Sequence, residues 1–201
     1  MTPFTTLTAP ALPLPFASID TDQIIPARFM SRSRAEGYGD VLLHDMRQSG
    51  EAAVLDDPAR AGAQIVVARR NFGSGSSREA AVYALADYGI RCVLAPSFGD
   101  IFAANAAANG LLAAVLPEVA TEDVLARLAA GLVPLTVDLD ACTVTAGDAV
   151  HCFEVDPVRR LKLLNGWDDF DLTARHADAI AAFTARDRAA RPWARPSCGD
   201  G

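Results

Sequence analysis

The segment from residue 64 to residue 116 alternates short apolar runs with longer helical patterns, and this alternation constrains the fold more than any other feature of the chain. Three runs rich in β-branched and aliphatic residues predict buried strands, at Gln64–Ala68, Ile90–Ala95 and Leu112–Leu116. Strands separated by helices in this way are typical of a parallel sheet with right-handed crossovers. We therefore expect an α/β fold with a parallel strand–helix core.

Two helices are expected between these strands. The first covers Ala80–Tyr88 and ends at Gly89, because glycine readily adopts the left-handed conformation that closes a helix. The second begins at Pro96-Ser97 and runs to about Asn109, with Gly110 as its end.

The pattern changes after residue 120. A short helix is predicted at Thr121–Ala130, and three alternating segments predict an antiparallel β section, at Pro134–Leu139, Cys142–Thr145 and Val150–Val155. Asp156-Pro157 begins a helix as N-cap and first helical residue, and Asn165-Gly166 ends it. Leu172–Arg186 reads as a further amphipathic helix.

The first sixty residues give weaker signals. Residues 1–16 contain four prolines and no basic leader pattern, so we expect an extended strand and not a signal peptide. Asp20-Thr21-Asp22 predicts a turn before a short element that Pro26 ends, and residues 31–62 predict a long functional or mobile loop with one or two helical turns. We expect one domain over residues 1–190 and a disordered tail at 191–201.

Composition excludes several classes of protein. Hydrophobic residues make up 51% of the 201, which excludes disorder as the main state. The 18 basic and 25 acidic residues give a net charge of −7 without a basic cluster, so neither nucleic acid nor an anionic membrane is an expected partner. Four cysteines without a close pair predict a reduced, cytoplasmic protein that holds no metal of its own.

The loop between the first two predicted strands carries the strongest chemical signal. It reads Gly-Ser-Gly-Ser-Ser-Arg-Glu at residues 73–79 and directly precedes a helix, where unpaired backbone N–H groups favour an anion. It matches neither a Walker A loop nor a full dinucleotide fingerprint. Ser76 and Glu79 have the spacing of a capping box, so the loop is either a helix cap or an anion site. A second serine and the cation of Arg78 beside a positive helix end favour the anion, and a carboxylate would suit the arginine fork.

This loop resembles the Gly-x-Gly-Ser-Ser-Arg-Glu-His motif of the swivel domain in the aconitase family, and the chain is most similar to the free-standing small subunits of 3-isopropylmalate dehydratase. The resemblance covers nearly the whole chain through further motifs, at Asp20 to Phe29, Pro96 to Phe102, Asn109 to Leu112, Arg159-Arg160, Leu164 to Gly166, Leu172-Thr173 and Asp178 to Ala182. It implies a single swivelling β/β/α domain of the aconitase C-terminal type, with an antiparallel β section and C-terminal helices beside the parallel core.

The resemblance also implies a function. Such subunits act with a large subunit whose [4Fe–4S] cluster binds the leaving hydroxyl of a small dicarboxylic hydroxy acid, and neither chain is active alone. The implied reaction is the hydro-lyase isomerisation of 2-isopropylmalate to 3-isopropylmalate in leucine biosynthesis. The alternatives are a related hydro-lyase for citraconate, dimethylmaleate or homoaconitate, and a stand-alone phosphate- or nucleotide-binding module that uses the same loop.

Site residues follow from the motif positions. The resemblance implies that Ser76 is the catalytic base and that Arg78 binds a substrate carboxylate. It implies substrate contacts at Ser77, Thr21, Asp22, Gly75 and Arg28. The substrate-specificity loop falls on Phe29, Met30, Ser31 and Arg32, which favours isopropylmalate over homoaconitate.

The chain departs from the family pattern at two positions. Ser74 stands where a cysteine is usual, and Ala80 stands where a histidine usually follows the glutamate. Because the proposed base and arginine are both present, we still expect activity. The missing histidine either loosens the support of the site or marks a paralogue acting on a related acid.

Other chemically capable residues have simpler explanations. Asp20 with Asp22 fits a turn better than a metal or acid–base pair, although the resemblance reverses this for Asp22. Scattered histidines and cysteines are expected to be structural, with Cys142 and Cys152 on neighbouring strands as free thiols. Trp167 is expected to be a packing anchor and the acidic group at 168–171 a turn and helix cap.

Overall fold

The computed structural model of the chain describes residues 1–131 and 134–194. Its contacts divide the chain into two compact units, Met1–Gly166 and Trp167–Gly201. The predicted limits, one domain over 1–190 followed by a disordered tail at 191–201, stay a prediction, and residues 195–201 of that tail lie outside the described residues.

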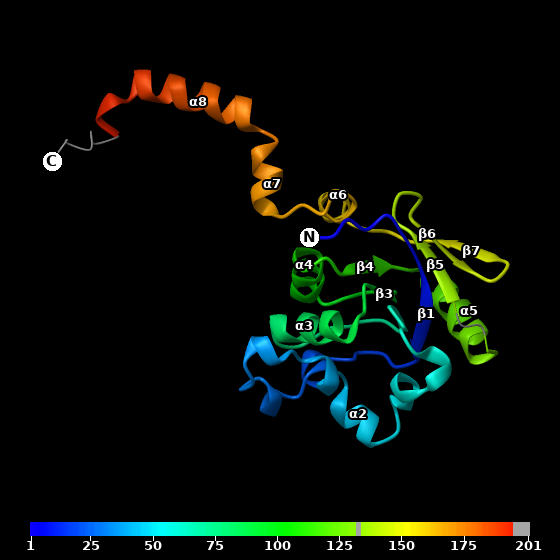
Figure 1. Cartoon of the computed structure of the whole chain (residues 1–201). Coiled ribbons are helices and arrows are strands. Elements are labelled where there is room, and N and C mark those ends of the chain that lie inside the picture. Colours follow the sequence, from blue (N-terminus) through cyan, green and yellow to red (C-terminus); the bar gives the residue numbers. More distant parts are fainter. Residues whose placement is uncertain (132–133, 195–201) are drawn as a thin grey trace. The chain divides into compact units, whose positions relative to one another are not determined.

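A mixed sheet forms the middle layer of the first unit (Figure 1). Within the described residues it has seven strands in the order β4-β3-β2-β1-β5-β6-β7. Their bounds are β1 Thr6–Leu14, β2 Ile65–Ala68, β3 Cys92–Ala95, β4 Leu112–Val115, β5 Pro134–Asp138, β6 Thr143–Ala146 and β7 Ala149–Cys152. Strands β1 to β4 pair in parallel, and β5 to β7 continue antiparallel from β1. The predicted parallel core and antiparallel section are both confirmed.

Strand β1 lies at the centre of the sheet although it contains Pro10 and Pro13. Proline cannot donate to a ladder and is normally confined to strand edges. In the register of the described strands, Thr6–Pro10 pairs with β5 and Ala11–Leu14 pairs with β2. Each half of β1 therefore has one partner strand, and a proline is tolerated on the other side.

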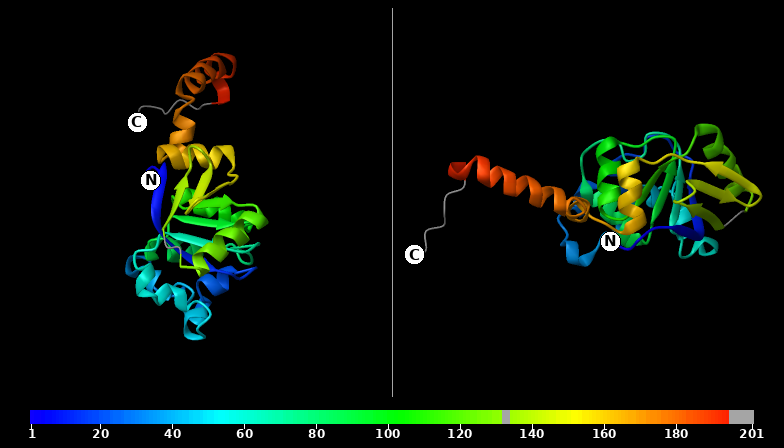
Figure 2. Two further views of the ribbon diagram at one scale, coloured as in Figure 1. Left: turned by 90° about the vertical axis from the view of Figure 1, so that its right-hand side faces the viewer. Right: turned by 90° about the horizontal axis from the view of Figure 1, so that it is seen from above.

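Helices cover both faces of the parallel part of the sheet (Figures 1 and 2). α3 (Glu79–Tyr88) and α4 (Asp100–Ala108) pack on one face, and α5 (Glu118–Ala129) packs on the other. The residues of β2 are therefore all buried: Val66 and Ala68 face the α3–α4 side, while Ile65 and Val67 face α5. Burial on both faces is why these strands read as continuous apolar runs in the sequence.

Some of the predicted helix ends are confirmed and others are wrong. Gly89 closes α3 at a φ of 109°, as expected, and Asp156 caps α6 (Pro157–Asn165), which ends at Gly166. The predicted start of the second helix at Pro96-Ser97 was wrong, because α4 begins only at Asp100. Residues 97–99 are extended instead: the carbonyl of Ser97 accepts from the N–H of Phe72 at 3.0 Å, which holds this segment beside the preceding loop. Helix α5 begins at Glu118, three residues before the predicted start.

The segment 31–62 is more ordered than the predicted long loop. It contains α2 (His44–Gln48) and four 3-10 turns, at η2 Arg34–Glu36, η3 Gly39–Val41, η4 Ala53–Asp56 and η5 Pro58–Arg60. Before it lie α1 (Thr21–Ile24) and η1 (Ala27–Phe29). Leu42, Leu43 and Leu55 belong to the same core as α3, and the N–H of Tyr38 donates to the Asp87 carboxylate at 2.8 Å. The apolar residues that anchor this segment to the core are scattered and follow no helical or strand period. For that reason the sequence predicted only one or two helical turns here.

The second unit contains α7 (Asp169–Ala174), α8 (Ala177–Ala190) and the turn η6 (Pro192–Ala194). The prediction of one helix over Leu172–Arg186 was wrong, because the helical conformation is interrupted at His176. Asp168 caps α7 in a capping box with Asp171, so the expected cap is found. The guanidinium of Arg175 lies 5.2 Å from the Trp167 ring, and the packing role expected for Trp167 stays a prediction. No helix in the described parts of the chain is long and apolar enough to cross a bilayer.

Candidate active site

Three loops meet where β1, β2 and β3 end, at the carboxyl edge of the parallel strands. Asp20, after β1, forms a bridge with Ser74, after β2. Phe72 in the same β2 loop forms a bridge with Phe98, after β3. Ligands of open α/β sheets bind at this edge, so the convergence places the Gly-Ser loop where a site is expected.

Glycines let the loop lie against its neighbours without space for a side chain. A Cβ on Gly73 would stand 2.2 Å from Cγ of Phe102, and a Cβ on Gly99 would stand 2.5 Å from the Gly73 carbonyl oxygen. Gly73 and Gly75 also have φ values of 71° and 94°, which other residues rarely adopt. The glycines at 73 and 99 thus allow the start of α4 to press against the loop.

Thr21 fixes the loop from the other side. Its side chain is 2% exposed, its N–H donates to the carbonyl of Ser74 at 2.9 Å, and its Oγ1 donates to the carbonyl of Ser76 at 3.0 Å. Asp20 holds Thr21 at the first turn of α1, because it forms a capping box with Gln23. Thr21 therefore contacts the backbone of the loop rather than its open face.

The predicted capping box of Ser76 and Glu79 is not formed. The N-cap of α3 is Arg78, which has no side-chain cap, and its N–H donates to the Ser76 carbonyl at 2.7 Å. Ser76 thus lies two residues before the cap, so the helix-cap explanation of the loop is wrong. Among the described residues, no hydrogen bond involves the hydroxyl of Ser76 or Ser77.

The same loop presents a run of unused donors. Among the described residues, no hydrogen bond is donated by the N–H groups of Gly75, Ser76 or Ser77, whereas Ser74 is engaged by its backbone bridge to Asp20. Successive N–H groups before a helix form an anion-binding concavity, to which the helix dipole contributes. The loop therefore combines two free hydroxyls with three free N–H groups before the start of α3.

Arg78 supplies the cation at this site and forms an ion pair with Asp22. Its side chain is 22% exposed, and that of Asp22 is 53% exposed. An ion pair this open adds little to stability, so its main effect is to hold the guanidinium beside the loop.

A hollow of about 230 Å³ lies against the loop. Its lining comprises Gly73, Ser74, Gly75, Ser76, Gly99, Asp100, Ile101 and Phe102. Sequence analysis did not select Asp100 or Ile101 as site residues. Their position at the start of α4, after the short loop that follows β3 at the same sheet edge, was the signal that could have found them.

Arg28 and the predicted specificity segment lie in a separate cluster. The Arg28 guanidinium pairs with Asp45, contacts Nδ1 of His44 at 3.2 Å and stacks 4.7 Å from the Phe29 ring centroid. Arg28 and then His44 hold the pKa of the Asp45 carboxyl at about 2. Among the described residues, no hydrogen bond joins this cluster to the Gly-Ser loop.

The rest of the specificity segment surrounds Phe29. Arg32 lies 5.3 Å from its ring centroid and pairs with Asp40 at 2.8 Å, while the Ser31 hydroxyl donates to the Arg28 carbonyl at 3.4 Å. Met30 remains 41% exposed. A hollow of about 290 Å³ lies beside Phe29 and Arg32.

The two departures from the family motif fall in different surroundings. Ser74 lines the hollow and pairs through its backbone with Asp20, so its side chain is not needed to shape the loop. Ala80 is partly buried and packs against the core on the α3 side. The effects of Ser74 and Ala80 on activity stay predictions.

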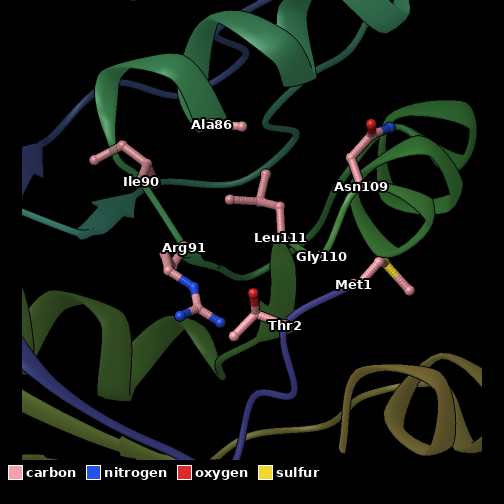
Figure 3. A pocket seen from close by; sticks show the side chains of 8 residues that line it. All are labelled: Met1, Thr2, Ala86, Ile90, Arg91, Asn109, Gly110 and Leu111. Carbon is pink, nitrogen blue, oxygen red and sulfur yellow. The ribbon is translucent and has the colours of Figure 1, made fainter. Parts of the chain in front are cut away.

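Residues at the opposite sheet edge line another hollow, of about 290 Å³ (Figure 3). Arg91 and Leu111, just before β3 and β4, lie in its wall. The Arg91 guanidinium is 5.5 Å from the Phe4 ring centroid, and α3 and α4 both end here with partial negative charge. These neighbours account for Arg91 without a ligand.

Other candidates are structural. Cys92 is buried, and its burial raises the pKa of its thiol. Cys142 and Cys152 lie near one another but are free thiols, as expected. His151 pairs with Asp123 at 2.8 Å, far from the loop in the sheet order. Within residues 1–131 and 134–194, no three histidine, cysteine or acidic side chains are grouped as a metal site would require.

The fold and the loop define an aconitase-type C-terminal domain. The family model described as Aconitase C-terminal domain matches residues 1–119. A model described as LeuD_N matches 123–157, and one described as the C-terminal domain of the 3-isopropylmalate dehydratase small subunit matches 171–197. A crystal structure of 3-isopropylmalate dehydratase from Methanocaldococcus jannaschii superposes with a TM-score of 0.65 over 88% of this chain and 98% of that one, at 21% identity, which supports the fold.

Relatives that match along nearly the whole chain define the family more specifically than the domain models do. The 3-isopropylmalate dehydratase small subunit of Acidothermus cellulolyticus is 50% identical and covers 98% of this chain and 100% of its own. That of Rhodospirillum centenum is 46% identical over 96% of this chain and 99% of its own. The chain belongs to the family of 3-isopropylmalate dehydratase small subunits.

Proposed function

We propose that this chain is the small subunit of a 3-isopropylmalate dehydratase, which isomerises 2-isopropylmalate to 3-isopropylmalate by removing and re-adding water in leucine biosynthesis. Relatives that match over the whole length bear that name. The observation that carries the proposal is the run of free donors at the loop: three N–H groups and two hydroxyls have no partner among the described residues, and the Arg78 guanidinium follows them directly. A dianionic hydroxy acid is a substrate that such a set of donors suits.

Arg78 binds one substrate carboxylate through its planar fork, which presents two parallel N–H donors. Asp22 keeps the guanidinium beside the loop until the substrate arrives. The backbone N–H groups from Gly75 to Ser77 add donors for the same anion. Ser77 and Gly75 thus contribute mainly through their backbone, while Thr21 positions the backbone of Ser76.

Ser76 acts as the base in this proposal. As an alkoxide it takes the proton from the substrate carbon next to the one that loses hydroxide, so that a carbon–carbon double bond forms; the proton on the serine and the departed hydroxide are together the elements of water. Returning the proton and the hydroxide to exchanged carbons gives the isomer and restores the alkoxide. A serine hydroxyl ionises to an alkoxide only in a positive, water-poor environment, and the α3 N-terminus and Arg78 supply the positive part. A docked partner would exclude water.

The proposal assigns a [4Fe–4S] cluster to the iron–sulfur large subunit. This chain's own residues do not fit such a cluster, because its cysteines are dispersed and the described residues contain no group of metal-ligating side chains. The three described cysteines are free thiols, in keeping with a cytoplasmic location.

Arg28 and residues 29–32 are proposed to contact substrate only in the assembled enzyme. In the isolated chain the Phe29 ring packs against Arg28, Arg32 and His44, and no hydrogen bond among the described residues links this cluster to the loop. Both lie in the unit Met1–Gly166, so substrate in the assembled enzyme would have to reach from one to the other.

The test is reconstitution with the iron–sulfur large subunit of the same genome. We expect turnover of 2-isopropylmalate only when both chains are present, and faster turnover than with citraconate, dimethylmaleate or a homoaconitate-type acid. Faster turnover of one of those acids would change the proposed substrate but leave the proposed hydro-lyase class unchanged. Tight nucleotide binding by the chain alone, without turnover in the mixture, would overturn the proposal.

A further inference from the structure

Helix α4 contacts the active-site loop at both ends of that loop. At the start of α4, Gly99 lies against the Gly73 carbonyl, and the ring of Phe102 fills the space beside Gly73. At the other end of α4, the side chain of Asn109 reaches the first turn of α3. The segment from Gly73 to Glu79 is therefore held at its beginning and its end by one helix.

The second contact rests on Asn109, the C-cap residue of α4. Its Nδ2 donates to Oε1 of Glu79 at 3.1 Å and to the carbonyl of Asn105 at 2.9 Å. Glu79 follows Arg78 directly and is the first residue of α3. We infer that Asn109 is a positioning residue for the proposed reaction: through Glu79 it fixes the first turn of α3, and with it Arg78 and the free donors of the loop.

The contact matters because α3 begins without a side-chain cap. An uncapped helix start loses order easily, since its first N–H groups have no partner within the helix. The Glu79 side chain reaches Asn109, as the 3.1 Å hydrogen bond shows, and burial and the nearby Glu79 carboxylate raise the pKa of Tyr83, one turn along α3. Arg78 instead extends to Asp22. The amide of Asn109 donates to a side chain and satisfies none of the first N–H groups of α3; it ties the first helical residue to the end of α4 instead.

The inference rests on the proposed function for its kinetic test, so a second measurement is made on the chain alone. In the full-length chain, we expect Asn109→Ala to speed hydrogen exchange at the amides of Ala81 to Tyr83 severalfold. Asn165→Ala is the matched control, because Asn165 Nδ2 donates to the Leu161 carbonyl at 2.9 Å, four residues back, at the end of α6. It should leave exchange in α3 unchanged. Unchanged exchange in Asn109→Ala would overturn the inference, whatever the enzyme does.

In the reconstituted enzyme, we expect Asn109→Ala and Glu79→Ala each to lower kcat/KM by about three- to tenfold, the effect of one hydrogen bond. The double variant should be no worse than either single one, because both remove the same contact. Glu79→Gln retains the acceptor oxygen and should remain near the wild-type value. Additive losses, or a loss in Glu79→Gln as large as in Glu79→Ala, would overturn the positioning role. If the wild-type mixture has no activity, the proposed function fails, but the exchange result still decides the contact.

Discussion

The hydroxyl of Thr21 donates to the backbone carbonyl of Ser76 across 3.0 Å, and this bond joins the loop after β1 to the loop after β2. The two residues are 55 positions apart in the sequence. Because Thr21 is 2% exposed, water cannot replace the donor. The carbonyl of Ser76 also accepts from Arg78, so this one oxygen fixes both proposed catalytic residues.

Thr21→Val keeps the shape of this side chain and removes the donor. We expect a loss of about 1 kcal/mol in the free energy of unfolding, together with a kcat at least severalfold lower. Thr121→Val is the matched control: Thr121 is equally buried and donates to the carbonyls of Leu116 and Pro117, away from the loop. It should lose similar stability without losing kcat. Equal kcat in both variants would show that the Thr21 bond is only structural.

Ser76→Ala tests the base. Loss of a general base lowers turnover by about 10²- to 10⁴-fold, so kcat of the reconstituted enzyme should fall by at least a hundredfold. Co-purification with the large subunit should be unchanged, because the hydroxyl has no partner among the described residues. Ser33→Ala, in the 3-10 turn at Arg34–Glu36, is the control and should retain full turnover. Full activity in Ser76→Ala would refute the assignment of the base.

Arg78→Lys keeps the charge and removes the planar fork. We expect a higher KM for isopropylmalate and a kcat/KM lower by about tenfold or more, because lysine cannot bind a carboxylate through two parallel bonds. Arg70→Lys is a suitable control, since among residues 1–131 and 134–194 the Arg70 side chain makes one open ion pair, with Glu118 at 3.8 Å. An unchanged kcat/KM in Arg78→Lys would remove the carboxylate-binding role.

Gly73→Ala tests the close packing of the loop on α4. Both Gly73 and Gly62 have φ values near 70°, but a Cβ at position 62 would meet nothing within 4 Å. Gly62→Ala should therefore lower the free energy of unfolding only by the cost of a left-handed backbone conformation at a non-glycine residue, about 1–2 kcal/mol. Gly73→Ala should cost several kcal/mol more, measured by chemical unfolding, because its Cβ would overlap the Phe102 ring. Equal losses would mean that the loop can move away from α4.

Acid stability depends on carboxylates paired with arginine. Arg28 and His44 hold the pKa of Asp45 at about 2, below the unfolded value of about 3.9. A depressed pKa in the folded state stabilises above the unfolded pKa, and the contribution is lost as pH falls through the folded one. The Tm of Asp45→Asn should thus lie slightly below that of the wild type at pH 6. The difference should disappear between about pH 4 and pH 2. A difference that persists at pH 2 would contradict the charge explanation.

The parallel core was predictable because its signal is local. Strands β2 to β4 are covered on both faces and read as continuous apolar runs, and Gly89 and Gly166 mark helix ends through conformations that glycine alone adopts easily. The segment 31–62 was not predictable in the same way. Its apolar residues follow no period, and only contact with α3 shows that they are core.

The sequence by itself determined which residues are proposed to carry the chemistry: Ser76, Ser77 and Arg78 stand at a glycine-rich turn before a helix, and their order resembles one family's motif. It could not determine whether Ser76 caps that helix, because the spacing of Ser76 and Glu79 also fits a capping box. Only the tertiary structure decided that it does not. Thr21 and Arg78 both bind the Ser76 carbonyl, so the helix begins two residues later and the Ser76 hydroxyl is left free. The physical reason is that a hydrogen bond from a residue 55 positions away is invisible to any local pattern.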